Sequence, residues 1–194
     1  TFCWKVADTN KLELLKWARE EKECEWHGET INAVAEHGNL EMLKYCVANK
    51  CPIDKEACAN AAENGHLEVL KYLREEVKAP WDSRTADWAA SNGHLHILEY
   101  LVERKYDQFD EYACAWAAAN GHLDCLKYLH ETAKWPWNYR AVRYAHKNNH
   151  PDPQTCNPFH EPRNEEPTVL QLVSLPSIVA AGWKIDDARV SGEE

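Results

Sequence analysis

The stretch AAENGHLEVLKYLRE, residues 61–75, decides the fold because closely similar segments return along the chain. Its core NGHLEVLKYL (64–73) has three further copies: HGNLEMLKYC (37–46), NGHLHILEYL (92–101) and NGHLDCLKYL (120–129). The glycines of the four copies follow one another at intervals of 27 or 28 residues: Gly38, Gly65, Gly93 and Gly121. A period of this kind predicts a repeat array in which each unit packs against its neighbours.

Each unit has the pattern of two helices joined by a tight turn. Leu67, Leu70 and Leu73 recur at every third residue and predict an amphipathic second helix. The alanine-rich stretch ACANAAE (57–63) predicts a first helix, whose small side chains let neighbouring helices approach closely. The Asn-Gly dipeptide between the two suits the turn, because both residues tolerate a positive φ.

The predicted first helices also begin in a regular way. Residues that favour helix N-caps occupy equivalent positions: Asp54, Asp82, Asp110 and Asn138. An apolar residue stands immediately before each of them, and before His27 of an earlier copy, as in a hydrophobic staple: Trp26, Ile53, Trp81, Phe109 and Trp137. Three of the nine tryptophans are therefore expected at these helix starts.

The segment 61–75 resembles the helix-turn-helix core of the ankyrin repeat, whose pattern is roughly AAxxGHLEVVKLLLE. The resemblance covers about residues 2–150 and implies an all-α repeat solenoid that binds a protein on its concave face. The period of 27–28 is shorter than the usual repeat of about 33 residues, and no TPLH motif opens the first helix. The chain thus resembles short ankyrin repeats that lack projecting β-hairpin fingers, of the type seen in algae, oomycetes and large DNA viruses.

Two regions are expected. Residues 1–150 are predicted to form about five repeat units, incomplete at both ends, and residues 151–194 an irregular tail. The tail holds six of the nine prolines and eight acidic residues against three basic ones. Its apolar segment 168–183 has three open interpretations: it covers the last unit, it docks into a partner, or it is disordered.

Composition narrows the classes of function. The chain has 22 Lys and Arg against 32 Asp and Glu, a net charge of −10, which disfavours nucleic acid as a partner. No apolar run reaches the ~18 residues of a membrane-spanning helix. The sequence has eight cysteines and no signal peptide, so we expect reduced thiols in the cytoplasm or nucleus. An organelle reached through a cleaved transit peptide is the alternative.

No catalytic residue, cofactor or metal is predicted. The string 146–160 holds four residues that could bind zinc, namely His146, His150, Cys156 and His160. His150, however, is the histidine of the repeat turn, which recurs as His66, His94 and His122 without cysteine company, so a structural role is expected for it. Cys58 and Cys114 share a column with Ile31, which indicates packing. No nucleophile elbow or phosphate-binding loop is present.

Positions that vary between copies indicate where a protein partner binds. One such column runs Ala33, Asn60, Trp88, Trp116, Tyr144, and the column before it runs Asn32, Ala59, Asp87, Ala115, Arg143. With the turn residues, the predicted partner-binding set is Asn60, Glu63, Asn64, Asp87, Trp88, Asn92, Trp116, Asn120, Arg143 and Tyr144. Trp88 and Trp116 are the preferred anchors, although packing between first helices would also explain them.

The sequence thus predicts a non-enzymatic protein-interaction module or scaffold. The alternative is a permanent structural subunit of a large assembly, held by its repeat surface and tail.

Overall fold

The computed structural model describes residues 2–108, 110 and 112–134, and every element in these residues is a helix. The chain divides into two compact parts, an N-terminal part of residues 1–109 and a C-terminal part of residues 110–194. The boundary predicted at residue 150, the predicted tail with its apolar segment 168–183, and the string 146–160 lie outside the described residues.

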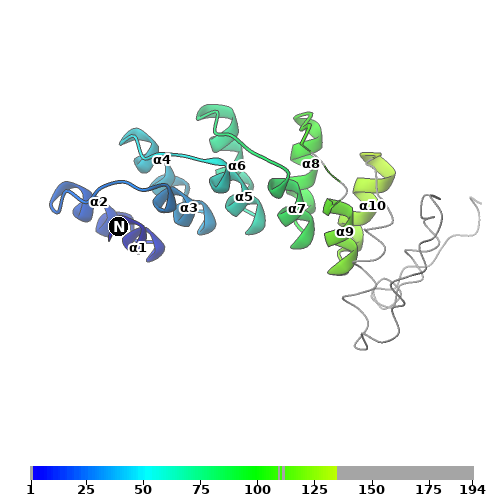
Figure 1. Ribbon diagram of the computed structural model, residues 1–194, viewed down its shortest axis with the longest axis horizontal. Coiled ribbons are helices and arrows are strands. Elements are labelled where there is room, and N and C mark those ends of the chain that lie inside the picture. The colour runs from blue at the N-terminus through cyan, green and yellow to red at the C-terminus, as the bar shows by residue number, and fades with distance from the viewer. Residues whose placement is uncertain (1, 109, 111, 135–194) are drawn as a thin grey trace, which may run out of the picture. The chain divides into compact units, whose positions relative to one another are not determined.

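The helices follow one another in pairs, as the repeat predicts (Figure 1). The pairs of the N-terminal part are α1 (Phe2–Asp8) with α2 (Leu12–Glu20), α3 (Gly28–Glu36) with α4 (Leu40–Ala48), α5 (Lys55–Glu63) with α6 (Leu67–Lys71), and α7 (Arg84–Ser91) with α8 (Leu95–Glu103). The C-terminal part contains α9 (Tyr112–Ala119) and α10 (Leu123–Lys127). Helix α6 continues into a π-helix, η1 (Tyr72–Glu76), and α10 into another, η2 (Tyr128–Thr132).

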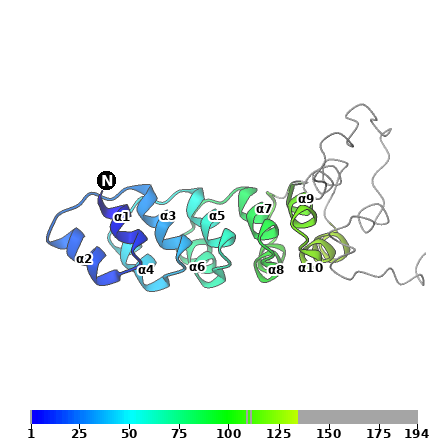
Figure 2. The ribbon, with the colours of Figure 1, turned by 90° about the horizontal axis from the view of Figure 1, so that it is seen from below.

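In the N-terminal part, the first helices of successive repeats pack side by side in the order α1, α3, α5, α7. Figure 2 shows them as one layer, with α4, α6 and α8 in a second layer. Small side chains allow this close packing, because Ala57, Ala61 and Ala62 on α5 are all fully buried. We call the layer of α1, α3, α5 and α7 the first-helix face.

Leucines of the second helices form the core between the two layers. Leu70 and Leu73 are fully buried, as predicted, whereas Leu67 at the start of the same helix is only half-buried. Val69 takes its place in the core.

No described helix is both long and apolar enough to pass through a bilayer.

Histidine and glycine join consecutive units. Gly38 has φ +70°, and a Cβ added there would lie 2.4 Å from the His66 ring of the following unit. Nε2 of His66 lies 2.8 Å from the Glu36 carbonyl oxygen; since a carbonyl only accepts, this nitrogen donates the hydrogen bond. His94 repeats the arrangement, 2.9 Å from the carbonyl oxygen of Glu63. The structural role predicted for these two histidines is confirmed, and the bond reaches the preceding unit.

The asparagines before Gly65 and Gly93 differ in backbone conformation from the glycines that follow them. Asn64 and Asn92 keep negative φ values of −98° and −105°, so only the glycine adopts a positive φ. Each asparagine amide donates 3.0 Å to the carbonyl oxygen four residues earlier, that of Asn60 or of Trp88. Each carbonyl also accepts from the backbone N–H of the same asparagine, so the side-chain amide adds a second bond at the helix end.

Two of the predicted N-caps are confirmed and one behaves differently. The carboxylates of Asp54 and Asp110 each accept 2.9 Å from the backbone N–H two residues on. The Asp82 side chain makes no cap bond and instead pairs with Lys55 at 3.0 Å and Arg84 at 3.1 Å. Although partial burial opposes ionisation, these two cations hold the pKa of Asp82 below its usual value. Asn138 lies outside the described residues.

Replacing Asp54 by alanine is expected to lower the free energy of unfolding by about 1 kcal/mol, because α5 loses its side-chain cap. Urea unfolding followed by circular dichroism measures this change. Asp54→Asn keeps the accepting oxygen and is expected to cost less than about half as much. Equal losses in the two variants would show that the cap bond is not the cause.

Tryptophans at the helix starts contact the second helices and the segments that follow them. Trp26 donates 2.9 Å to the carbonyl oxygen of Asn49 and packs edge-on against Tyr45. Trp81 lies under the Arg74 guanidinium, 3.8 Å from the ring centroid, and edge-on to Tyr106 at 4.7 Å. These contacts link successive units, which the staple prediction did not include. Phe109 and Trp137 lie outside the described residues.

The prediction that all the thiols are reduced is wrong for one pair. Cys3 on α1 and Cys24 after α2 are joined by a disulfide, with a Cα–Cα distance of 5.9 Å. They come together because the first helix pair folds back on itself, a contact that their separation of 21 residues does not reveal. The other described cysteines are all buried: Cys46, Cys51, Cys58, Cys114 and Cys125.

Candidate protein-binding face

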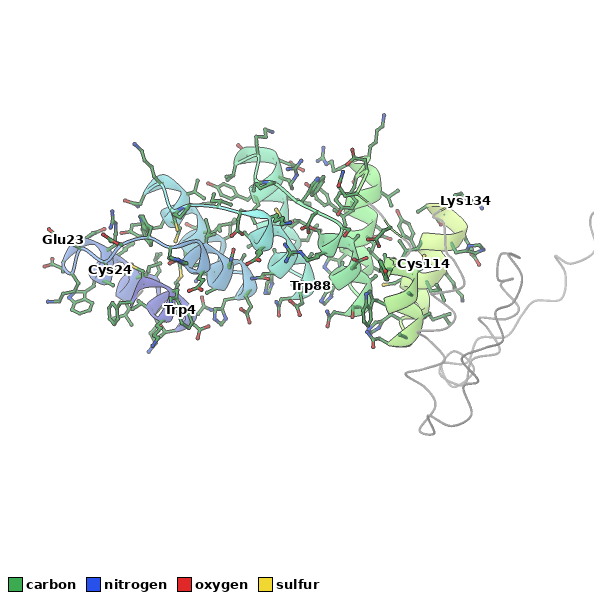
Figure 3. All side chains as sticks on the ribbon, viewed as in Figure 1. Trp4, Glu23, Cys24, Trp88, Cys114 and Lys134 are labelled. Atoms are coloured by element: carbon green, nitrogen blue, oxygen red, sulfur yellow. A yellow bond between two sulfur atoms is a disulfide. The ribbon has the colours of Figure 1, made fainter. Side chains whose placement is uncertain are left out.

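The predicted anchor column differs in exposure from copy to copy. Ala33 is buried, Asn60 and Trp88 are half-buried, and Trp116 is 37% exposed. Figure 3 labels Trp88 on α7, where the Arg84 guanidinium lies 5.8 Å from its ring centroid. On α9 the contrast is sharper, because every residue from 113 to 119 except Trp116 is buried. The largest side chain of this alanine-rich helix is therefore also its most exposed one within that range.

The column before the anchors lies inside the helix layer. Ala59 and Ala115 are buried, and Asp87 is only 8% exposed. One step along an α-helix turns the side chain by about 100°, which carries this column from the surface toward the neighbouring helices. Asp87 is thus buried, although it belongs to the predicted binding set. Arg143 and Tyr144 lie outside the described residues.

The predicted turn residues form an exposed polar rim. Glu63, Asn64, Asn92 and Asn120 are all exposed. The amides of Asn64 and Asn92 are engaged in the helix-end bonds described above, so part of their polarity serves the fold.

A groove on the first-helix face was not predicted from the sequence. It has a volume of about 330 Å³ and is lined by residues of α1, α3 and α5: Trp4, Asp8, Glu29, Asn32, Ala33, Glu36, Glu56 and Asn60. We call it the acidic groove, because four of these residues are carboxylates and none is Lys, Arg or His. Asn60 is the one member of the predicted set that lines it. The equivalence of Glu29 with Glu56, one period apart, was the available signal.

Partners of the groove carboxylates lie around its edge. Asp8 is 3.2 Å from Nε2 of His37, and Glu56 is 3.6 Å from the Arg84 guanidinium. Asn32 donates from its amide to the second carboxylate oxygen of Glu56, at the long distance of 3.3 Å. The Glu36 side chain makes no ion pair within the described part of the chain.

Cys58 and Cys114 have no reactive setting. Burial raises the pKa of Cys58 and of Cys114 to about 12, so both are neutral thiols at physiological pH. This supports the packing role expected for their column. In the described ranges, no cluster of three or more His, Cys, Asp or Glu side chains is arranged to hold a metal ion.

Comparison with protein families identifies the repeat. A family model of ankyrin repeats, in three copies, matches residues 31–111. The matched range contains α3 to α8, including the two histidine–glycine junctions described above. A search of the curated proteins found no match to the chain.

Proposed function

Because residues 31–111 of this chain are ankyrin repeats, we propose that it is a non-enzymatic module that binds a partner protein through its first helices. Ankyrin repeats in general are protein-interaction modules, whose stacked units create an extended binding surface. Three points belong to the proposal: the position of the binding site on the first helices, the protein nature of the partner, and the absence of catalysis.

The observation that carries the proposal is the exposure of Trp116. Six residues of α9 are buried around it, most of them alanines, while 37% of this tryptophan is exposed. Burying this exposed apolar area against a partner would be favourable. Tryptophan is also the residue most enriched at the energetic centres of protein interfaces.

Changing Trp88 and Trp116 to alanine together is expected to reduce partner binding by about 30-fold or more, because loss of one anchor costs about 2 kcal/mol. The partner is first identified by mass spectrometry after capture from the native source, and its affinity is then measured with purified proteins. Helical circular dichroism is expected to persist.

Trp17→Ala is the matched control for this double variant. Trp17 is also exposed but lies on the second helix α2, so its loss is expected to leave partner affinity within about twofold of the original. Unchanged affinity in the Trp88 and Trp116 variant would contradict the assignment of partner binding to the first helices.

A permanent subunit of a larger assembly is the second candidate function. Phe2, Leu14 and Trp17 favour it, because they place large apolar side chains on the surface of the first helix pair. Such a surface is typical of an interface that is covered continuously. A chain purified under native conditions as a monomer would contradict it.

A cytoplasmic or nuclear location is also part of the proposal. The buried thiols of Cys46, Cys51, Cys58 and Cys114 support a reducing compartment, where free thiols persist. The Cys3–Cys24 disulfide is the feature that argues for the organelle alternative.

A further inference from the structure

We propose that the acidic groove binds an arginine-bearing basic segment of the partner protein. This inference rests on the proposed function and specifies the chemistry that the first-helix face recognises. It concerns α1, α3 and α5, none of which carries a tryptophan anchor.

Charge is the first argument. Four carboxylates line a groove of about 330 Å³ with no basic side chain among the lining residues. Those of Asp8, Glu29 and Glu56 are each more than half exposed, so they remain accessible to a partner. Like charges held close together repel, and a cation placed among them relieves that repulsion.

Asn32 supplies the second, independent argument. It lines the groove, is only 8% exposed, and its amide oxygen has no hydrogen-bond partner. A buried acceptor without a donor is costly, which makes a donating ligand favourable here.

Trp4 favours arginine over lysine as the bound residue. Its half-buried ring forms part of the groove wall, and Nζ of Lys5 already lies 5.9 Å from the ring centroid, so a cation reaches this ring. A guanidinium stacks on an aromatic face and presents a planar fork of donors to carboxylates, whereas an ammonium is a compact point charge. The groove offers arginine both an aromatic ring and carboxylates in one place.

The same charges disfavour other occupants. The segment 151–194 carries eight acidic and three basic residues, and a second copy of the chain brings a net charge of −10. Nucleic acid would place phosphates against four carboxylates. A basic protein segment is the occupant with complementary charge.

The test uses the full chain and two short glycine–serine peptides, one with two arginines and a twin with citrulline, the uncharged analogue, at both positions. Binding is measured by fluorescence anisotropy at low and high salt. We expect the arginine peptide to bind more tightly than its twin, and its affinity to fall as salt rises. No binding of either peptide, or equal binding of both, would overturn the proposal.

Charge-matched variants locate the site. Glu29→Gln with Glu36→Gln is expected to weaken the arginine peptide about tenfold. Glu41→Gln with Glu68→Gln removes the same charge from exposed positions on α4 and α6, and is expected to change affinity by less than about twofold. Equal losses in the two pairs would mean that net charge alone attracts the peptide, which overturns the groove as the site.

Capture of the identified partner separates this inference from the proposed function. If the Glu29 and Glu36 variant still captures the partner fully while the Trp88 and Trp116 variant does not, the inference fails and the proposed function stands. Loss of capture in both variants, with the Glu41 and Glu68 control intact, supports both.

Discussion

Replacing Leu70 by alanine is expected to lower the free energy of unfolding by about 3–5 kcal/mol, one of the two largest effects expected for a single substitution in this chain. Leu70 lies on α6, is fully buried, and fills the space between the two helix layers. Its removal leaves a cavity that the closely packed alanine layer cannot collapse to fill. Urea unfolding monitored by circular dichroism and by tryptophan fluorescence measures the loss.

Leu14→Ala is the matched control for the cavity. Leu14 occupies the second helix α2 but is 37% exposed, so its truncation is expected to cost less than about 1 kcal/mol. A loss as large as that of Leu70→Ala would mean that burial in the core is not the cause, since alanine itself has the higher helix propensity.

Gly38→Ala is expected to cost about 2–4 kcal/mol, because it combines two penalties at one position. The backbone has φ +70°, which costs an L-residue about 1–2 kcal/mol. The new Cβ would also lie 2.4–2.6 Å from three atoms of the His66 ring, so the ring must move. Its 2.8 Å bond to the Glu36 carbonyl oxygen would then be lost, at a further cost of about 1 kcal/mol.

Two other glycines separate these penalties. Gly121 has φ +75°, but no atom of the described residues lies within 4 Å of an added Cβ, so Gly121→Ala is expected to carry the backbone cost alone, about 1–2 kcal/mol. Gly28, on α3, has neither a positive φ nor a close backbone neighbour, and Gly28→Ala is expected to be neutral or slightly stabilising. Thermal unfolding ranks the three variants. If Gly38→Ala costs no more than Gly121→Ala, the contact with His66 contributes nothing.

The helices and turns could be predicted from the sequence because each depends on neighbouring residues. The spacing of Leu70 and Leu73, the alanines of α5 and the cap at Asp54 are local signals, and the repeat supplied several independent copies of each. Asp82 departs from its equivalents because Lys55 and Arg84 offer it ion pairs, and only the assembled fold brings Lys55 near.

The candidate site could be predicted only in part, since a repeat reveals columns but not which column faces outward. Trp116 is 37% exposed, whereas Asp87 in the adjacent column is buried. The difference between them is one step of helix rotation, which the apolar pattern of an alanine-rich helix does not fix: nearly every side chain on α9 is small and apolar. The acidic groove was missed because its walls come from three helices far apart in the sequence.

The histidine–glycine junction has a consequence for how such a chain can grow. The repeat of α5 and α6 supplies one imidazole donor, His66, to the repeat before it and one backbone acceptor, the Glu63 carbonyl, to the repeat after it. A duplication of one whole unit in the gene therefore adds a donor and an acceptor together, and the hydrogen bonds stay balanced at every new seam. A duplication that ends inside a unit leaves one half of the bond unmatched. Selection for stability thus favours lengthening by whole units, which is how a strict period persists while individual surface residues diverge.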